Sequence, residues 1–144
     1  MGGDEVTHLL DTNVWLWAYL DTGALPDDIR SILDQPDAQF GLSAISLWEV
    51  GKKHQIGRLD LKQELGTWLR GAVASHIQVL PLTPEIVAEA MSLPDFPNRD
   101  PGDELVVATA RVHKLTLLTS DTGLKGYRHA RIRHFTPVVE PGKR

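Results

Sequence analysis

Carboxylates interrupt apolar segments at two places in the sequence, and such positions could carry chemistry. Asp11 follows the pair Leu9-Leu10 and precedes the apolar run NVWLWAYL, while Asp121 closes the segment LTLLTSD. A charge between buried segments is costly unless it is paired or bound to a cation. Each acid also has a structural explanation, because Asp11 could cap a helix and Asp121 could form a turn. The residue types alone leave both roles open.

Two further acids lie in, or at the start of, expected helices. Glu49 follows Ile45 by four positions and Trp48 by one, which places it near the apolar side of its helix. An exposed helix position is the alternative for this residue. Asp103 comes three residues after Asp100 in the segment DPGD, a pattern typical of a capped helix start. An acid there also interacts favourably with the helix dipole, which is a sufficient structural reason for it.

Strands and helices are expected to alternate along the chain. Apolar runs bounded by turn residues predict strands over 6–11, 38–43, 77–82, 115–121 and, more briefly, 131–135. Amphipathic runs predict helices over 13–20, 26–36, 44–56, 62–76, 83–92 and 102–114. Ser43 suits the N-cap of the third of these helices, and Gly57 suits the position after its end. This alternation predicts an α/β domain with a parallel sheet and helices on both faces.

The four acids are expected to meet at one edge of that sheet. Ligands of parallel sheets bind beyond the carboxyl ends of the strands, where Asp11 and Asp121 lie. Asp103 starts the helix that leads into the last long strand, and Glu49 lies about two turns into a helix that begins at the same edge. Carboxylates gathered in this way repel one another unless hard cations such as Mg²⁺ or Mn²⁺ separate them. Such ions suit phosphoryl chemistry, because they polarise the phosphate and activate water.

The overall composition limits the class of protein. The chain has 144 residues, of which 42% are hydrophobic and 24% charged, so we expect one globular domain over 1–144 with its core at about 6–135. No apolar run is long enough to cross a membrane. Cysteine is absent, which excludes disulfides and Cys-ligated zinc. The acidic, Gly-rich start does not resemble a secretory signal, and we expect a cytoplasmic protein with no membrane partner.

Four segments of the sequence, taken in order, resemble those of a known family. They are LLDTNVWLW, LSAISLWEVGKKHQIGRL, VLPLTPE and RDPGDELVVATARVHKLTLLTSD. The set is similar to the motifs of PIN-domain proteins, most nearly the VapC-type toxins of bacterial toxin–antitoxin pairs, and the resemblance extends from about residue 6 to residue 135. It implies a three-layer α/β/α sandwich with a mostly parallel central sheet. It also implies an endoribonuclease that uses one or two Mg²⁺ or Mn²⁺ ions, a cognate VapB-type antitoxin that blocks the site, and a homodimer.

The resemblance also assigns roles to individual residues. The acids that it places at the catalytic and metal site are Asp11, Glu49, Asp103 and Asp121. The small polar residues that it places in support of these acids are Thr12, Asn13, Ser43 and Thr119. Hydroxyls and amides in such positions orient carboxylates or water. We expect Asp100 to cap its helix and Asp103 to face the metal, although the two could exchange roles.

Two residues depart from the pattern of the family. Relatives often carry an aromatic residue or alanine at the position of Gly102, and an arginine at the position of Glu104. Glu104 adds negative charge beside Asp103. We expect it to face solvent or to form a salt bridge, with membership of the metal site as the alternative.

Basic residues are needed because RNA would be repelled by a bare acidic cleft. The net charge is −4, yet basic residues outnumber acidic ones from Arg111 to Arg144. This asymmetry indicates an anionic partner, with an ordinary solvated surface as the alternative. The candidates for RNA contact are Lys52, Lys53, Arg58, Arg99, Arg128 and Arg131, with Lys125 and Arg133 in the same basic end. Specificity would then come from RNA shape and unpaired loops, or from the partner.

The four tryptophans are expected to be mainly structural, and the histidines to be surface residues or at most RNA contacts. Core packing accounts for most of Trp15, Trp17, Trp48 and Trp68, although some could form a groove for an antitoxin segment or a dimer partner. The histidines do not show the spacing of a metal site.

Three other classes of protein compete with the nuclease hypothesis. A phosphatase of the haloacid-dehalogenase type also uses an acid after its first strand, but it usually needs a second Asp at the position of Asn13. A non-catalytic binding module with a degenerate nuclease fold is disfavoured because all four acids are present. A receiver-type signalling domain would need paired acids at the first strand end and a late lysine, and neither is clear here.

Overall fold

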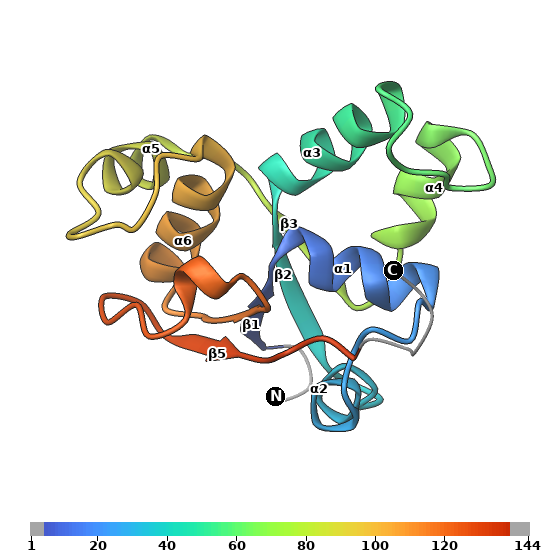
Figure 1. The fold of residues 1–144 in the computed structure, drawn as a ribbon, viewed down its shortest axis with the longest axis horizontal. Coiled ribbons are helices and arrows are strands. Elements are labelled where there is room, and N and C mark those ends of the chain that lie inside the picture. The colour runs from blue at the N-terminus through green and yellow to red at the C-terminus, as the bar shows by residue number, and fades with distance from the viewer. Residues whose placement is uncertain (1–4, 139–144) are drawn as a thin grey trace.

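The computed structural model describes residues 5–138 and contains one five-stranded sheet (Figure 1). The strands are β1 (Val6–Leu10), β2 (Gln39–Ser43), β3 (Ile77–Leu80), β4 (Thr116–Thr119) and β5 (Ile132–His134). Their order is β3-β2-β1-β4-β5, and every neighbouring pair is parallel. The prediction of a mostly parallel sheet is confirmed, and within residues 5–138 the sheet is parallel throughout.

Helices cover both faces of the sheet. They are α1 (Thr12–Leu20), α2 (Asp27–Leu33), α3 (Ala44–Gln55), α4 (Leu65–Ala72), α5 (Pro84–Met91) and α6 (Pro101–His113), with a short 3₁₀ helix, η2 (Thr122–Leu124), after β4. In Figure 1, α5 and α6 lie on one side of the sheet and α1 and α4 on the other, which gives the three layers expected. None of the described helices combines the length and the apolarity that a membrane span requires.

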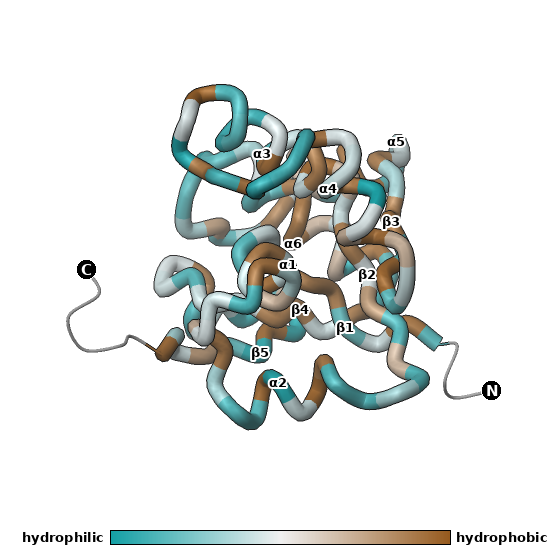
Figure 2. Tube along the Cα trace, turned by 90° about the vertical axis from the view of Figure 1, so that its right-hand side faces the viewer, coloured by the Kyte–Doolittle hydropathy of each residue, from teal (hydrophilic) through white to brown (hydrophobic). Residues whose placement is uncertain are grey.

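The core is divided by the sheet, because successive strand residues point to opposite faces. Leu10 packs in one apolar cluster with Trp15 of α1, and Leu9 packs in another with Val107 of α6. All four side chains are at most 1% exposed. Full burial of such side chains stabilises a fold by about 1.5–3 kcal/mol each. Figure 2 shows the hydrophobic segments running through the central strands, while the outer loops are mostly hydrophilic. The strand that ends at Asp11 is therefore firmly held.

Local residue choice explains most helix ends, with one exception. Ser43 caps α3 as predicted, since its hydroxyl accepts an N–H of the first turn at 3.3 Å. Gly57 follows the end of α3 with φ = 78°, the left-handed conformation that glycine adopts easily. The helix predicted over 62–76 is wrong at both ends, because α4 covers only Leu65–Ala72. Lys62 and His76 both adopt left-handed backbone conformations, with φ of 61° and 65°, which a helix cannot contain.

The topology marks one point on the sheet as a natural ligand site. From β1 the chain moves outward to β2 and β3 on one side, and β4 and β5 fill the other side. In open parallel sheets, ligands bind at the carboxyl ends of the two neighbouring strands from which the chain proceeds in opposite directions across the sheet. Here that point lies between β1 and β4, the strands followed by Asp11 and Asp121.

Candidate active site

The carboxyl edge of the sheet holds an open pocket of about 480 Å³. Five carboxyl groups and one ammonium group line it, and they belong to Asp11, Glu49, Asp100, Asp103, Asp121 and Lys53. The four acids predicted from the sequence are therefore brought together, and Asp100 joins them. They come from four separate segments of the chain, which meet here because the carboxyl ends of parallel strands share one edge.

Asp11 is held through both carboxylate oxygens. Its Oδ1 accepts the backbone N–H of Thr12 at 2.8 Å, so Asp11 is the N-cap of α1. Its Oδ2 accepts the hydroxyl hydrogen of Thr119 at 2.5 Å. The helix-cap role and a place in the pocket are thus not alternatives. Each oxygen still has a lone pair that could bind a cation.

One buried hydroxyl connects the acids at the ends of β1 and β4. Besides donating to Asp11, the hydroxyl oxygen of Thr119 accepts the backbone N–H of Asp121 at 3.0 Å. Asp121 in turn caps η2, because its Oδ1 accepts the N–H of Gly123 at 2.8 Å. Thr119 is completely buried, so water does not compete for these bonds. The relative position of the two acids is fixed by this side chain.

A chain of two hydroxyl groups, those of Ser46 and Thr12, leads to the carboxylate of Glu49. The hydroxyl of Thr12 donates to Glu49 Oε1 at 2.6 Å. Thr12 has one hydroxyl hydrogen, so the 2.7 Å contact with Ser46 Oγ must have Ser46 as its donor. The sequence reasoning missed Ser46, although it precedes Glu49 by one helical turn and lies on the same face.

Gly102 leaves the space that the Glu49 carboxylate occupies. A Cβ atom at this buried glycine would lie 2.4 Å from Glu49 Oε2 and 3.1 Å from Asp100 Oδ1. The first distance is too short for any real contact, so a side chain at position 102 would displace Glu49. The glycine that departs from the family pattern therefore makes room for Glu49, whose carboxylate extends to the first turn of α6.

Asp100 and Asn98 organise the start of α6. Asp100 Oδ1 accepts the N–H groups of Gly102 at 2.8 Å and Asp103 at 3.2 Å, which confirms the predicted helix cap. Asn98 donates to Asp103 Oδ2 at 3.1 Å and accepts the N–H of Asp100 at 2.9 Å. The sequence reasoning missed Asn98, whose one signal is its place two residues before the helix cap.

Crowding and burial raise the pKa values of three acids in the pocket. Burial is the main cause for Asp11, Glu49 and Asp103 alike. The pKa of Asp103 rises to about 7, because the charges of Asp100 and Asp121 add to the effect of burial. Near neutral pH the pocket therefore binds a proton readily, and a bound cation would relieve the same repulsion.

The donor set fits a hard divalent cation. The acidic wall offers carboxylate oxygens, the ligands that Mg²⁺ and Mn²⁺ prefer, and the chain has no cysteine. Within residues 5–138, no three His, Asp or Glu side chains stand close enough together to form a ready-made cage.

Lys53 is the one RNA-contact candidate that lines the acidic pocket in the described chain. Its Nζ donates to Asn13 Oδ1 at 3.3 Å, so both residues lie at the pocket wall. Lys52 lies at the preceding position of α3 and is exposed. Arg58 follows the end of α3, and Arg99 precedes the start of α6 with its side chain exposed.

Arg128 and Arg131 lie at the opposite edge of the sheet. They line a hollow with Lys114, which connects the end of α6 to the start of β4. Arg131 donates to the carbonyl oxygen of Lys114 at 3.2 Å. The basic end of the sequence is therefore not brought to the acidic pocket by these two residues.

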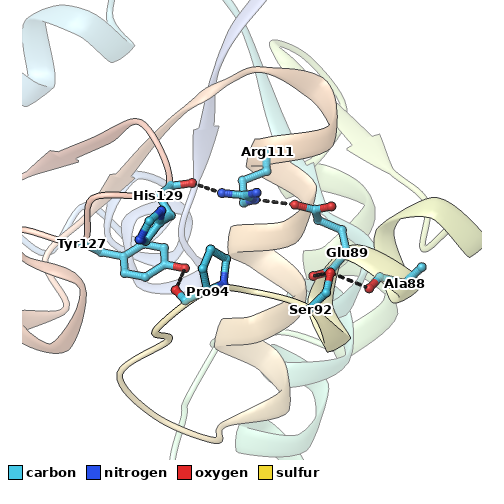
Figure 3. A network of polar contacts seen from close by, with 7 residues as sticks. All are labelled: Ala88, Glu89, Ser92, Pro94, Arg111, Tyr127 and His129. Atoms are coloured by element: carbon cyan, nitrogen blue, oxygen red, sulfur yellow. Dashed lines mark hydrogen bonds and ion pairs between the residues drawn. The ribbon is translucent and has the colours of Figure 1, made fainter.

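A polar network beside this hollow connects α5 and α6 to the loop before β5 (Figure 3). Arg111 of α6 donates to the carboxylate of Glu89 on α5 and to the carbonyl oxygen of His129. The hydroxyl of Tyr127 donates to the carbonyl oxygen of Pro94 at 2.7 Å. Arg111 is consequently committed to structural contacts.

Two other residues singled out in the sequence do not line the acidic pocket. Ser43 is completely buried, and its hydroxyl serves the cap of α3 and does not line the pocket. Glu104 is half-buried and forms no ion pair with any residue between 5 and 138. Neither residue contributes to the pocket wall.

Known proteins share this sequence pattern and this fold. Residues 8–130 match the PIN domain. The chain is 31% identical to Ribonuclease VapC22 of Mycobacterium tuberculosis over 125 residues, which cover 87% of this chain and 95% of that protein. The structure of DNA-bound VapBC from Salmonella typhimurium matches with a TM-score of 0.68 at 17% identity, over 90% of this chain and 98% of that chain. VapBC2 from Rickettsia felis, bound to a DNA fragment from its promoter, matches with a TM-score of 0.65 at 15% identity over the same shares.

These likenesses differ in what they establish. The solved structures are too distant in sequence to indicate more than a shared fold. The domain match covers most of the chain, and the VapC22 match covers nearly the whole length of both proteins. The chain therefore belongs to the PIN-domain family and is a homologue of a VapC ribonuclease.

Proposed function

We propose that this protein is a VapC-type toxin, a ribonuclease that hydrolyses RNA phosphodiesters with the help of one or two Mg²⁺ or Mn²⁺ ions. The observation that carries the proposal is the pocket in which Asp11, Glu49, Asp103 and Asp121 converge. The relative that supports it is 31% identical and is itself a ribonuclease. A pocket wall of this composition, with no nucleophilic cysteine in the chain, favours hydrolysis by water.

The acids would divide the work according to their environments. Asp11, Asp103 and Asp121 would coordinate the ion directly or through water, with Asp11 and Asp121 kept in place by the hydroxyl of Thr119. A bound divalent ion supplies a water of lowered pKa and offsets the charge that develops on the phosphate. Glu49, whose pKa is raised by burial, would orient the attacking water or hold a second ion.

Neighbouring residues would control the charge and geometry of the pocket. Lys53 places a positive charge against the acidic wall, where it would offset the repulsion between the acids and an RNA phosphate. Thr12 holds the carboxylate of Glu49 by its 2.6 Å hydrogen bond. Asn13 occupies the third position after β1 without adding a further negative charge.

Regulation by a cognate VapB-type antitoxin and assembly as a homodimer form part of the same proposal. The antitoxin is proposed because structures that share this fold, from Salmonella typhimurium and Rickettsia felis, are of VapBC. The homodimer is proposed only because the resemblance to VapC-type toxins implies one. In a toxin of this kind, the antitoxin would close the acidic pocket and so prevent RNA from entering.

Cleavage of total RNA by the purified protein tests the enzyme hypothesis. We expect cleavage with Mg²⁺ or Mn²⁺, none with EDTA, and none for Asp11→Asn. Asp37→Asn, at an exposed acid outside the pocket, is the matched control and should cleave normally. Cleavage that survives both EDTA and Asp11→Asn would refute the metal-carboxylate mechanism. If no RNA is cleaved and calorimetry detects no ion binding, a non-catalytic binding module becomes the better explanation.

Expression in a bacterial host tests the toxin hypothesis separately. We expect growth arrest with the wild-type chain, none with Asp11→Asn, and relief when the small gene next to the toxin gene is expressed with it. Normal growth despite demonstrated RNA cleavage would contradict the toxin role while leaving the ribonuclease activity in place.

A further inference from the structure

Trp48 differs from the tryptophans of the core. Trp15 is 0% exposed and Trp68 is 5% exposed, whereas Trp48 on α3 is 60% exposed. An indole ring on the surface leaves much apolar area in contact with water, and such exposure commonly marks a binding surface. Core packing therefore accounts for Trp15 and Trp68 but not for Trp48.

The exposed ring forms one wall of a second pocket. This pocket has a volume of about 530 Å³, and apolar atoms form most of its lining, with Ile45 and Pro101 beside Trp48. Gly102 adds no side chain to the floor. The volume falls in the range that holds small organic groups.

The apolar pocket and the acidic pocket share a boundary. Glu49 and Asp100 line both of them. A group that entered the apolar pocket would therefore lie directly beside whatever occupies the acidic one. A phosphodiester in the acidic pocket carries a nucleoside on each side. One of these two nucleosides can extend across the shared boundary into the apolar pocket.

Positive charge accompanies the exposed ring. The Lys52 ammonium lies 5.6 Å from the centroid of the Trp48 ring and donates to Gln55 at 2.7 Å. The next residue, Lys53, lines the acidic pocket. An aromatic platform flanked by cations is the usual way in which proteins bind single-stranded nucleic acid, since bases stack on the ring and phosphates pair with the cations.

We propose that the apolar pocket binds an unpaired nucleobase of the RNA substrate, stacked on Trp48, with Lys52 against the adjoining phosphate. The inference rests on the proposed ribonuclease function, because it is the phosphodiester in the acidic pocket that brings a base to this boundary. It adds a substrate class, since a base that is paired in a duplex could not reach the ring. Single-stranded segments would be bound in preference to double-stranded RNA.

Binding of short oligoribonucleotides tests the proposal without requiring a known cleavage sequence. The protein carries Asp11→Asn so that the RNA stays intact, and fluorescence anisotropy measures affinity in Mg²⁺. The probes are a single-stranded RNA, the corresponding duplex, and an oligomer of the same length whose riboses carry no bases. We expect the single strand to bind more tightly than either of the other probes, because only its bases can stack.

Substitutions at Trp48 then identify the ring responsible. Trp48→Ala should weaken binding of the base-bearing strand by about tenfold or more and leave the abasic oligomer unaffected. Trp48→Phe should retain most of the affinity. Met91→Ala is the matched control, since Met91 is 71% exposed on α5 and lies outside both pockets. Thermal unfolding should be unchanged in all three variants, because none of these side chains is buried.

Other outcomes would overturn the proposal in distinguishable ways. Equal losses for base-bearing and abasic oligomers would mean that Trp48 does not contact a base. If Trp48→Ala changes self-association in sedimentation while the preference for bases persists, the apolar pocket is a protein interface instead. If the wild-type protein cleaves no RNA but Trp48→Ala still removes base-dependent binding, the proposed enzyme fails and the nucleobase site stands.

Discussion

Replacing Asp103 with asparagine should stabilise the metal-free protein at and above neutral pH while abolishing RNA cleavage. Burial and the charges of Asp100 and Asp121 raise the pKa of Asp103 from 3.8 to about 7. This difference corresponds to about 4 kcal/mol, at about 1.4 kcal/mol per pH unit. Because Asp103 is only partly buried, solvent screening reduces the figure to about 1–2 kcal/mol.

Two smaller effects set the expected net value. Asp103 lies in the first turn of α6, so losing its charge costs about 0.3–1 kcal/mol of favourable interaction with the helix dipole. Asn98 can keep its hydrogen bond, since an asparagine at position 103 can still present an oxygen to it. The net gain should be about 1 kcal/mol, or about 2–4 °C in Tm.

The sign of the pH dependence follows from the raised pKa. Below about pH 4, Asp103 is protonated in both the folded and the unfolded chain, so the substitution changes little. As the pH rises from about 4 to about 7, the unfolded chain releases this proton while the folded chain retains it, and the wild-type protein loses stability. The advantage of Asp103→Asn should therefore grow across this interval and stay constant above it.

Thermal unfolding in EDTA between pH 4 and pH 8 measures this difference, with Asp37→Asn as the exposed control. Adding Mg²⁺ at pH 8 should stabilise the wild type and not Asp103→Asn, because the ion binds the ionised carboxylate that the substitution removes. A variant that is less stable than the wild type at pH 8 in EDTA would refute the reasoning. So would an advantage that does not change with pH.

Three further substitutions test the positions of individual groups. Gly102→Ala should slow cleavage by about tenfold to a hundredfold, because the new methyl group displaces the carboxylate of Glu49. It should change the free energy of unfolding by less than about 1 kcal/mol, because the methyl group meets side-chain atoms and not backbone. An unchanged cleavage rate would contradict this packing. Thr119→Val should weaken Mg²⁺ binding more at pH 6 than at pH 8, because Asp11 loses the hydrogen bond that opposes the rise of its pKa. Calorimetry at the two pH values, with Thr116→Val as the control, checks this. Trp15→Phe should lower the free energy of unfolding by about 2 kcal/mol, because a cavity forms and the carbonyl oxygen of Ala72 loses the indole N–H; equal stability in urea would speak against both effects.

The fold and the acidic pocket could be predicted because they depend on periodic patterns. The alternation of apolar strands with amphipathic helices indicates a parallel sheet, and the carboxyl ends of its strands share one edge. Asp11 and Asp121 lie within two residues of the ends of β1 and β4, so their convergence needed no knowledge of side-chain packing. The helix cap at Asp100 was equally local, because the DPGD segment contains every residue that the cap uses.

Contacts between distant segments could not be predicted in this way. The space that Gly102 leaves for Glu49 depends on the distance between α3 and α6, which neither helix encodes alone. The exposure of Trp48 has the same origin, since its neighbours on the apolar side of α3 gave no sign that the ring would remain uncovered. The placement of Arg128 depends on the course of the loop between η2 and β5, which has no periodic pattern.

The hydroxyl contact between Thr119 and Asp11 joins residues 108 positions apart in the chain. During synthesis, β1 and α1 leave the ribosome early, but β4 can pair with β1 only after the helices between them have emerged. Until then Asp11 has neither its hydroxyl partner nor Asp121 beside it. The growing polypeptide thus has no assembled nuclease centre, and a ribosome that makes this chain is not exposed to its activity until β4 has emerged.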